Sequence, residues 1–188
     1  MRRLIVGMSG ASGSVYGARI LEALSTVPDI ETHLVLTDTA KFNIRHETGR
    51  DPEEVIRLAN YVHDIGNLAA PISSGSFKTA GMIVAPCSVK TASGIANSYS
   101  ENLLLRAADV CLKERRPLVL LFRETPLHLG HLEILKKITL LGGIILPPIP
   151  GFYNRPKTLD DIVNHSAGRA LDLLSVEHDL FQRWEGAG

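Results

Sequence analysis

Short runs of apolar, mostly β-branched residues recur along the chain, and each is too short to form an independent helix. They predict buried strands over Leu4–Met8, His33–Leu36, Met82–Ala85, Leu118–Phe122 and Gly143–Leu146. Between them, apolar residues recur three and four positions apart, which is the spacing of one helix face. This spacing predicts helices over Tyr16–Leu24, Thr39–Glu47, Pro52–Tyr61, Thr91–Asn97, Asn102–Lys113, Leu129–Leu141 and Leu159–Leu174.

Regular alternation of strands and helices indicates βαβ units, which have right-handed crossovers and place helices on both faces of a parallel sheet. We therefore expect an α/β fold, a doubly wound parallel sheet in a single domain over residues 1–188. The stiff segment Pro147–Gly151 cannot be helical, and the chain after it, residues 150–188, is expected to wrap outward. Ligands of such sheets bind outside the carboxyl ends of the strands, so functional residues should directly follow each strand.

Composition and charge argue against nucleic-acid binding, membrane binding and secretion. The 188 residues are 45% hydrophobic, enough for one sizeable core, and 20 basic residues balance 20 acidic ones. No overall field favours nucleic acid or an anionic membrane surface, so an anion site must be local. Cys87 and Cys111 form no paired framework, and the apolar run after Arg3 is too short for a signal or membrane-spanning segment. A cytoplasmic protein without disulfides is expected.

The first strand is followed by a loop of small residues, Gly7–Ser14, which lets backbone amides approach an anion at a helix start. The loop predicts a phosphate cradle, although a tight turn explains the same glycines and serines. It is neither a Gly-x-Gly-x-x-Gly motif, since Ser9 takes a glycine position, nor a P-loop. Thr37 and Asp38 follow the second strand and either face the same ligand or only cap a helix.

The middle strand repeats this arrangement. Pro86 ends it, and Ser88, Lys90 and Thr91 open the next helix, which gives the crevice a second polar rim. Cys87 invites interpretation as a nucleophile, but no histidine lies near it in sequence, and a small buried hydrophobe is the better interpretation. The polar stretch Ile72–Phe77 is either a plain loop or a segment that closes over a ligand.

Five segments in this order and spacing resemble the UbiX/Pad family of flavin prenyltransferases. They are Gly10-Ala11-Ser12-Gly13, Pro86-Cys87-Ser88-x-Lys90-Thr91, Leu112–Val119, Arg123–Leu127 and Gly151-Phe152-Tyr153. The resemblance covers essentially the whole chain and implies a Rossmann-like, flavodoxin-type fold. It also implies metal-independent transfer of a dimethylallyl group from dimethylallyl monophosphate, or in some members the diphosphate, onto reduced FMN. The prenylated FMN would serve a UbiD-like decarboxylase.

The resemblance also implies roles for individual residues. FMN would be bound by Gly10, Ala11, Ser12, Thr37, Ser88, Val89, Lys90, Thr91 and Arg123. The phosphate of the prenyl donor would be held by Lys113, Arg123, Tyr153 and Arg169. Such cations and hydroxyls suit phosphate oxygens and the charge that develops on a departing phosphate.

Acids and aromatic residues complete this implied site. Glu124 would pass a proton to the leaving phosphate, and Glu47 would act similarly near the flavin, so that the catalytic set is Glu47, Lys113, Arg123 and Glu124. Trp184 would face an allylic cation or only anchor packing. Taken without the family, Glu47 and Arg169 are ordinary helix-surface residues. Arg115 and Arg116 are best explained as a solvated helix end.

Competing interpretations remain open at this point. His128 and His131 are three apart, as metal ligands can be, but no third ligand has suitable spacing, so no metal is expected. A related cysteine decarboxylase usually carries Pro-Ala-Ser-Ala-Asn-Thr and Met-Asn motifs that this chain lacks. An aromatic acid decarboxylase and a non-catalytic FMN carrier are two further candidate functions. The resemblance implies trimer-based homo-dodecamers with active sites at subunit interfaces, so Tyr153 and Arg169 could come from neighbouring chains.

Overall fold

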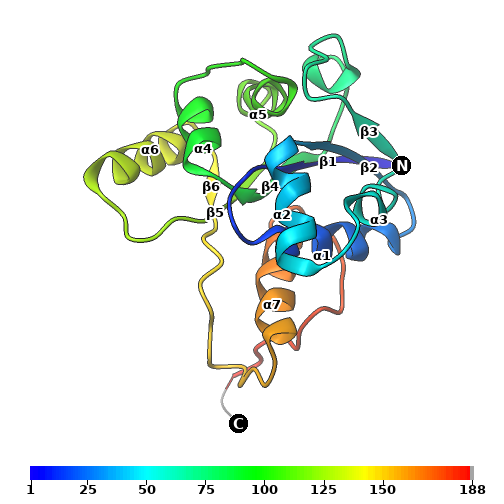
Figure 1. Cartoon of the computed structure of the whole chain (residues 1–188), viewed down its shortest axis with the longest axis vertical. Helices are drawn as coiled ribbons and strands as arrows, with labels where there is room; N and C mark the ends of the chain where they lie inside the picture. The colour runs from blue at the N-terminus through cyan, green and yellow to red at the C-terminus, as the bar shows by residue number, and fades with distance from the viewer. Residues whose placement is uncertain (187–188) are drawn as a thin grey trace.

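The computed structural model describes residues 1–186 and shows a six-stranded parallel sheet with helices on both faces (Figure 1). The strands are β1 (Arg2–Met8), β2 (Ile30–Leu36), β3 (Tyr61–His63), β4 (Gly81–Cys87), β5 (Leu118–Phe122) and β6 (Ile144–Ile145). The helices are α1 (Ser14–Ser25), α2 (Asp38–Thr48), α3 (Pro52–Ile56), α4 (Val89–Ala96), α5 (Leu103–Lys113), α6 (Leu129–Leu140) and α7 (Leu159–Asp172), with a 3₁₀ turn η1 at Pro71–Ser73.

The strand order, β3-β2-β1-β4-β5-β6, places the reversal of chain direction across the sheet between β1 and β4. This is the Rossmann order, and without the short edge strand β3 the remaining five strands follow the flavodoxin order. The predicted doubly wound α/β fold is therefore confirmed. A ligand crevice is expected outside the carboxyl ends of β1 and β4, where the connections diverge.

Two apolar cores hold the sheet between its helical layers. Leu4, Val6 and Met8 of β1 point to one face, where α1, α2 and α7 cover them. Ile5 of the same strand points to the other face, which α4 and α5 cover. Because side chains alternate along a strand, a continuous apolar run such as that of β1 supplies both cores. The carboxyl ends of the central strands are thereby held rigidly at one edge of the sheet.

The segment after α2 departs from the sequence prediction, which was wrong in extending one helix over Pro52–Tyr61. Helix α3 ends at Ile56, and Tyr61 begins β3, which pairs in parallel with β2 from His33 to Val35. Asn60 fixes the change of direction, because its Oδ1 accepts a hydrogen bond of 2.8 Å from the Thr32 amide. As a three-residue edge strand with half-exposed side chains, β3 has no apolar run to reveal it in the sequence.

The C-terminal part begins with an extended arm, residues 146–158, which leaves β6 and runs away from the sheet before α7 turns back (Figure 1). Helix α7 packs on α1 and shares its core, and Arg2 donates hydrogen bonds to the carbonyls of Leu174 and Ser175. The segment expected to wrap outward, residues 150–188, therefore does so only in the arm, because α7 packs back on the domain. Residues 187–188 lie outside the described residues. None of the helices within residues 1–186 is long and apolar enough to cross a bilayer.

Candidate active site

A buried serine joins the two loops that follow β1 and β4. The Ser9 hydroxyl is 1% exposed, donates to the Pro86 carbonyl at 2.8 Å and accepts from the Ser88 amide at 2.8 Å. The residue that breaks the dinucleotide motif is therefore a hydrogen-bonded brace between the two rims of the crevice. Sequence reasoning did not assign it this role.

Replacing Ser9 with alanine leaves the Ser88 amide without its buried acceptor and removes one of the two hydrogen bonds to the Pro86 carbonyl, which keeps the bond of 3.2 Å from the amide of residue 9. We expect Ser9→Ala to lower the free energy of unfolding by roughly 1–3 kcal/mol. Chemical denaturation measures this loss, and Ser25→Ala at the exposed end of α1 is the control. A Ser9→Ala protein as stable as the control would show that the brace contributes nothing.

A cleft of about 740 Å³ opens at this edge of the sheet, a size typical of cofactor sites. The first turns of α2 and α4 form its walls, and Thr37 and Ser88 cap these helices by accepting hydrogen bonds from the amides of Ala40 and Thr91. The lining residues are Gly10, Thr37, Thr39, Ser88, Lys90, Thr91, Ser93, Gly94, Asn97, Tyr99, Glu101, Asn102 and Leu105. The polar part of this surface consists largely of hydroxyl groups and two helix N-termini, which suits a phosphate, and the rest is apolar, which suits a ring system.

Gly10 shows how closely the chain packs beside the cleft. A Cβ at this position would lie 2.7 Å from Cγ2 of Thr39, well inside van der Waals contact. The absence of a side chain therefore lets the loop after β1 lie directly against the start of α2. At Gly10 this loop presents backbone rather than a side chain to the crevice.

Only part of the expected FMN set lines this cleft. Gly10, Thr37, Ser88, Lys90 and Thr91 do so. The other expected FMN ligands, Ala11, Ser12, Val89 and Arg123, lie outside its lining, with Val89 packed against the core under α4.

The sequence did not single out several polar residues of the cleft: Ser93, Asn97, Tyr99, Glu101 and Asn102. Most of these follow a helix rather than a strand. A search restricted to the ends of strands could not find them, although the polar run from Asn97 to Asn102 was a usable signal.

Glu47 lies against the first turn of α1 rather than in the cleft. Its Oε2 accepts hydrogen bonds from the amides of Gly13 and Ser14, at 3.0 and 2.9 Å, and from the Ser14 hydroxyl at 2.7 Å. Burial alone would raise the pKa of this carboxyl, but the hydrogen bonds from Ser14, Ser12 and Gly13 outweigh burial and hold the pKa below its ordinary value. Glu47 is thus a carboxylate at neutral pH, and it occupies two amides of the predicted cradle.

Replacing Glu47 with glutamine removes the negative charge at the start of α1. We expect the free energy of unfolding to fall by only about 1 kcal/mol, because Glu47 is exposed and water screens its charge. A folded-state pKa below the ordinary value of 4.5 means that this stabilisation is complete above pH 4.5 and lost as pH falls through the lower value. Thermal melts of both proteins should therefore differ most at neutral pH and converge in acid. A constant difference across that range would contradict this assignment.

Arg123 and Glu124 lie at the carboxyl end of β5. The Arg123 amide donates to the Cys87 carbonyl at 3.1 Å, which places it beside the loop after β4. Burial raises the pKa of Tyr16 in α1, and the positive charge of Arg123 partly offsets this, so the guanidinium lies near the start of α1. Glu124 accepts a hydrogen bond from the Thr125 amide at 2.9 Å. Both predicted residues therefore belong to the crevice edge of the sheet.

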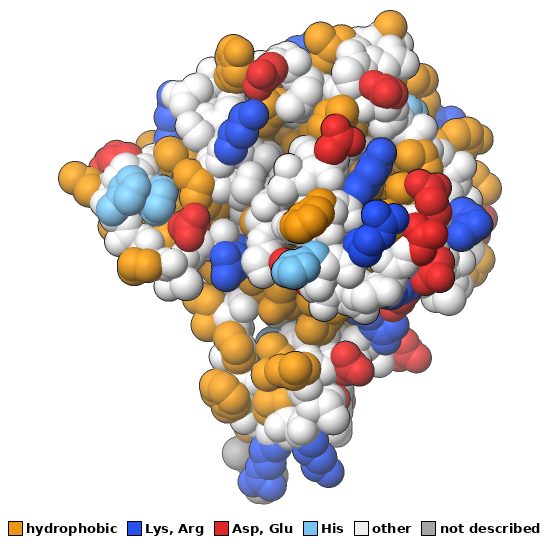
Figure 2. Space-filling model, viewed as in Figure 1, with side chains coloured by type: hydrophobic (Ala, Val, Ile, Leu, Met, Phe, Trp, Pro, Cys, Tyr) orange, Lys and Arg blue, Asp and Glu red, His pale blue; other side chains and the backbone are white. Residues whose placement is uncertain are grey.

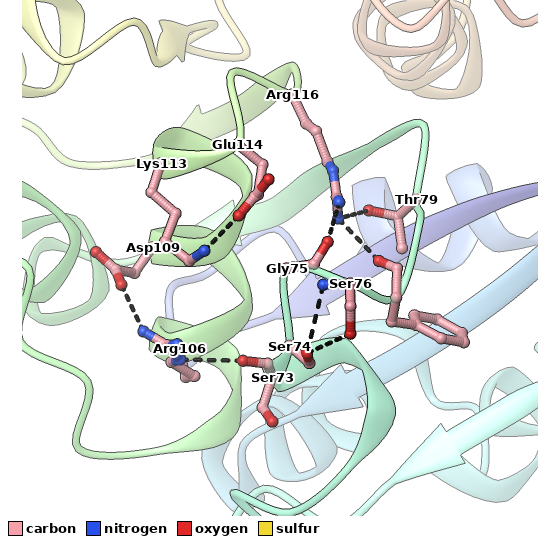
Figure 3. A network of polar contacts seen from close by, with 11 residues as sticks. Ser73, Ser74, Gly75, Ser76, Thr79, Arg106, Asp109, Lys113, Glu114 and Arg116 are labelled. Atoms are coloured by element: carbon pink, nitrogen blue, oxygen red, sulfur yellow. Dashed lines mark hydrogen bonds and ion pairs between the residues drawn. The ribbon is translucent and has the colours of Figure 1, made fainter.

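Lys113 lies at the opposite edge of the sheet, in a polar network between the end of α5 and the loop after η1 (Figure 3). It pairs with Glu114, and a Cβ on Gly75 would lie 2.7 Å from its Nζ. Arg106 in the same helix donates to the Ser73 carbonyl at 3.1 Å. The polar stretch predicted over residues 72–77 is thus held against α5.

Arg116 belongs to the same network, and the interpretation of a solvated helix end was wrong for this residue. Its guanidinium donates to the carbonyls of Gly75 and Phe77, at 2.5 and 2.9 Å, and to the Thr79 hydroxyl at 3.2 Å. Arg116 therefore fixes the loop against which Lys113 lies (Figure 3).

Tyr153 and Arg169 lie in a third place, on the arm and on α7. The Tyr153 hydroxyl lies 2.8 Å from Nε2 of His165, and its ring meets Trp184 edge to face with centroids 5.7 Å apart. Arg169 forms an ion pair with Asp172 at 3.0 Å, and Arg183 shares the same carboxylate at 2.8 Å. Both predicted phosphate ligands are therefore partly exposed in an aromatic and charged cluster.

One chain does not bring the predicted donor-phosphate residues together. Lys113 precedes β5 and Arg123 follows it, so the strand separates them by about 16 Å. Tyr153 lies on the arm and Arg169 on α7, a helix that covers the face of the sheet opposite to α5. Within one chain, the residues predicted to hold the donor phosphate therefore do not form a single site.

Cys87 and the pair His128 and His131 do not form a nucleophilic or metal-binding site. Cys87 is fully buried, and burial raises the pKa of its thiol, so it is not an activated nucleophile. The rings of His128 and His131 stack with centroids 3.6 Å apart at the start of α6. Over residues 1–186, no group of three His, Cys, Asp or Glu side chains is placed to hold a metal ion.

Comparisons with known proteins decide the family. The Flavoprotein family model matches residues 1–170. Flavin prenyltransferase UbiX of Escherichia coli strain K12 is 54% identical over 189 residues, covering 100% of both chains. This chain belongs to the UbiX family of flavin prenyltransferases. The flavoprotein fold, the FMN cofactor and the transferase class predicted from the sequence are thereby confirmed.

Two solved structures show how closely the UbiX fold is kept. A dodecameric FMN-dependent UbiX-like decarboxylase from Escherichia coli O157:H7 is 49% identical, with a TM-score of 0.95 over 98% of this chain and 100% of that one. AnUbiX (PadA1), crystallised with FMN and dimethylallyl pyrophosphate, is 45% identical, with a TM-score of 0.96 over 100% of this chain and 99% of that one. The UbiX arrangement of strands and arm thus extends through the described chain.

Proposed function

We propose that the cleft at the carboxyl edge binds FMN with its phosphate between the first turns of α2 and α4. The residues fit such a group. Thr37, Ser88 and Thr91 place hydroxyls at two helix N-termini, and Gly10 brings backbone within reach. Of the described lining residues, Lys90 carries the one positive charge and Glu101 the one negative charge, so binding would rest mainly on hydrogen bonds. Reduced FMN, when bound, supplies the nucleophile that accepts the prenyl group.

We propose that neighbouring copies of the chain complete the site for the prenyl donor. Lys113, Arg123 and the pair of Tyr153 and Arg169 lie in three separate places of one chain. Large apolar side chains that a monomer would leave in water support an assembly: Leu129 and Leu140 on α6 and Ile149 and Phe152 on the arm are each at least 72% exposed. Figure 2 shows such side chains over α6 and along the lower stem that carries the arm. The dodecameric relative supports the same assembly.

The chain's own residues then have distinct tasks in the proposed reaction. Lys113, Arg123 and Arg169 would stabilise charge on the phosphate oxygens as the carbon–oxygen bond of the donor breaks. The Tyr153 hydroxyl would donate a hydrogen bond to one of those oxygens. Glu124, at the crevice edge, would pass a proton to the departing phosphate, and Glu47 would act similarly as a proton shuttle near the flavin. No metal is needed, because phosphate leaves with the electron pair of the broken bond.

We propose dimethylallyl monophosphate as donor and a UbiD-like decarboxylase as recipient of the prenylated FMN. The neighbour crystallised with dimethylallyl pyrophosphate supports a dimethylallyl donor and leaves both phosphate forms to be compared. We also propose a cytoplasmic location. The free, buried thiols of Cys87 and Cys111 fit a reducing compartment.

The donor and the recipient can be tested in one experiment. The enzyme is incubated anaerobically with reduced FMN and either phosphate form, and the protein-free filtrate is given to a UbiD-like apo-decarboxylase with its aromatic acid. We expect carbon dioxide only after incubation with the monophosphate. Release after the diphosphate alone would reverse the donor assignment, and no release with either form would remove the recipient. Carbon dioxide released from 4-hydroxybenzoate by this chain alone would favour a decarboxylase function instead.

A further inference from the structure

His165 holds the hydroxyl group of Tyr153. It lies on α7 one turn before Arg169, so both side chains share one face of the helix. Its Nε2 is 2.8 Å from the Tyr153 hydroxyl, and the two rings meet edge to face with centroids 5.7 Å apart. Phe181 closes the other side of the imidazole at 4.9 Å. The imidazole is therefore fixed between two aromatic rings with one nitrogen directed at the tyrosine oxygen.

The arm supports the same geometry from the tyrosine side. A Cβ on Gly151 would lie 3.1 Å from the Tyr153 ring and 3.6 Å from Cε1 of His165. The glycine thus lets the arm fold tightly over the pair, and the edge of Trp184 meets the tyrosine ring from another side. Tyr153 nevertheless stays 54% exposed, so a ligand or a neighbouring chain can reach its hydroxyl.

The protonation state of His165 determines what the Tyr153 hydroxyl can do. Burial lowers the pKa of His165, the nearby positive charge of Arg169 lowers it further, and Asp172 only partly opposes them. The imidazole is therefore neutral at neutral pH and carries one proton. When that proton is on Nε2, the ring donates to the tyrosine oxygen, and the hydroxyl proton is free to point outward. When the proton is on Nδ1, the tyrosine hydroxyl donates to Nε2 of His165 and cannot donate to a ligand.

We propose that His165 is a positioning residue that donates from Nε2 to the Tyr153 oxygen and so directs the tyrosine hydroxyl proton at the phosphate of the prenyl donor. This inference rests on the proposed function, in which Tyr153 binds that phosphate. His165 itself touches no substrate. A glutamine amide can donate the same hydrogen bond, whereas leucine and methionine fill similar space without donating.

Two readouts test this in the full-length, FMN-loaded protein: the Kd of inorganic phosphate by isothermal titration, and the KM for dimethylallyl monophosphate. Tyr153→Phe is expected to raise both by roughly tenfold, the loss of one hydrogen bond to a charged group. His165→Leu should raise both by roughly three- to tenfold, and His165→Gln should restore most of the difference. The double variant Tyr153→Phe/His165→Leu should be no worse than Tyr153→Phe alone, because His165 acts through the tyrosine.

The controls separate positioning from packing. His63→Leu removes a comparable hydrogen bond, that of 2.9 Å to His33, at the far edge of the sheet and should leave both readouts unchanged. If His165→Leu does not fold or does not bind FMN, His165→Met takes its place as the apolar variant and is compared with His165→Gln in both readouts. The proposal is overturned if the apolar variants keep the wild-type Kd and KM, or if His165→Gln binds phosphate no better than His165→Leu. It is also overturned if the effects of Tyr153→Phe and His165→Leu add in the double variant, or if phosphate binding does not depend on Tyr153. Tyr153-dependent phosphate binding without prenyl transfer would instead overturn the proposed function and leave this role of His165 standing.

Discussion

Mixing subunits of Lys113→Met and Arg169→Ala, each expected to be inactive alone, should restore about a quarter of wild-type prenyl transfer. Each variant alone loses a cation that stabilises the departing phosphate, a loss expected to slow turnover by roughly a hundredfold or more. If one chain supplies Lys113 and another supplies Arg169, random mixing leaves both intact in about one site in four. The measurement is prenylated flavin formed after the two proteins are dissociated and reassembled together.

Neither residue lines the cleft proposed to bind FMN, so both variants should bind FMN as the wild type does. The double variant Lys113→Met/Arg169→Ala, mixed with wild-type subunits, controls for exchange of subunits. No recovery in the mixed sample, with exchange demonstrated, would mean that the two cations do not come from different chains. Full activity in either single variant would remove that residue from the site.

Replacing Gly17 with valine is expected to lower the free energy of unfolding by about 3 kcal/mol or more, because the helix cannot keep its distance from the sheet. A Cβ at Gly17 would lie 2.3 Å from the Ala85 carbonyl oxygen and 2.6 Å from Cε of Met8. The first of these contacts is with backbone and cannot be relieved by a side-chain rotation. Helix α1 would be pushed from β4, and its first turn, which Glu47 caps, would move with it. Chemical denaturation gives the stability.

Two further measurements make this result specific. Ser25→Val introduces the same side chain at the exposed end of α1, and we expect it to change stability by less than about 1 kcal/mol. Gly17→Ala should fall between the wild type and Gly17→Val. A Gly17→Val protein as stable as Ser25→Val would refute the close contact between α1 and β4.

The sequence predicted the central strands well because burial on both faces gives them continuous apolar runs. Strands β1, β4 and β5 were found for this reason, and their ends gave Gly10, Ser88 and Arg123 as residues of one edge. Strand β3 was missed because Tyr61 and Val62 are about half exposed and the strand carries no such run. The helix predicted before it ends at Ile56, so the apolar spacing beyond that residue does not correspond to a helix.

The site was predictable to the extent that it depends on strand ends. The cleft residues Thr37 and Thr91 follow from that rule, whereas Tyr99 and Glu101 follow a helix and do not. Glu47 could not be placed, because its partners, Gly13 and Ser14, are 33 or more positions away in sequence. Residue types alone also could not show that Lys113 and Arg123 lie at opposite edges of the sheet, and that separation is the reason for proposing that a second chain completes the site.

The mass of the flavin after reaction tests the central claim most directly. The protein is loaded with FMN, reduced without oxygen and given dimethylallyl monophosphate, and the extracted flavin is examined by mass spectrometry. We predict a flavin heavier by one prenyl unit with the wild type, and unmodified FMN with Arg169→Ala, which should retain its FMN. Unmodified FMN from the wild-type protein with FMN binding intact would contradict the account.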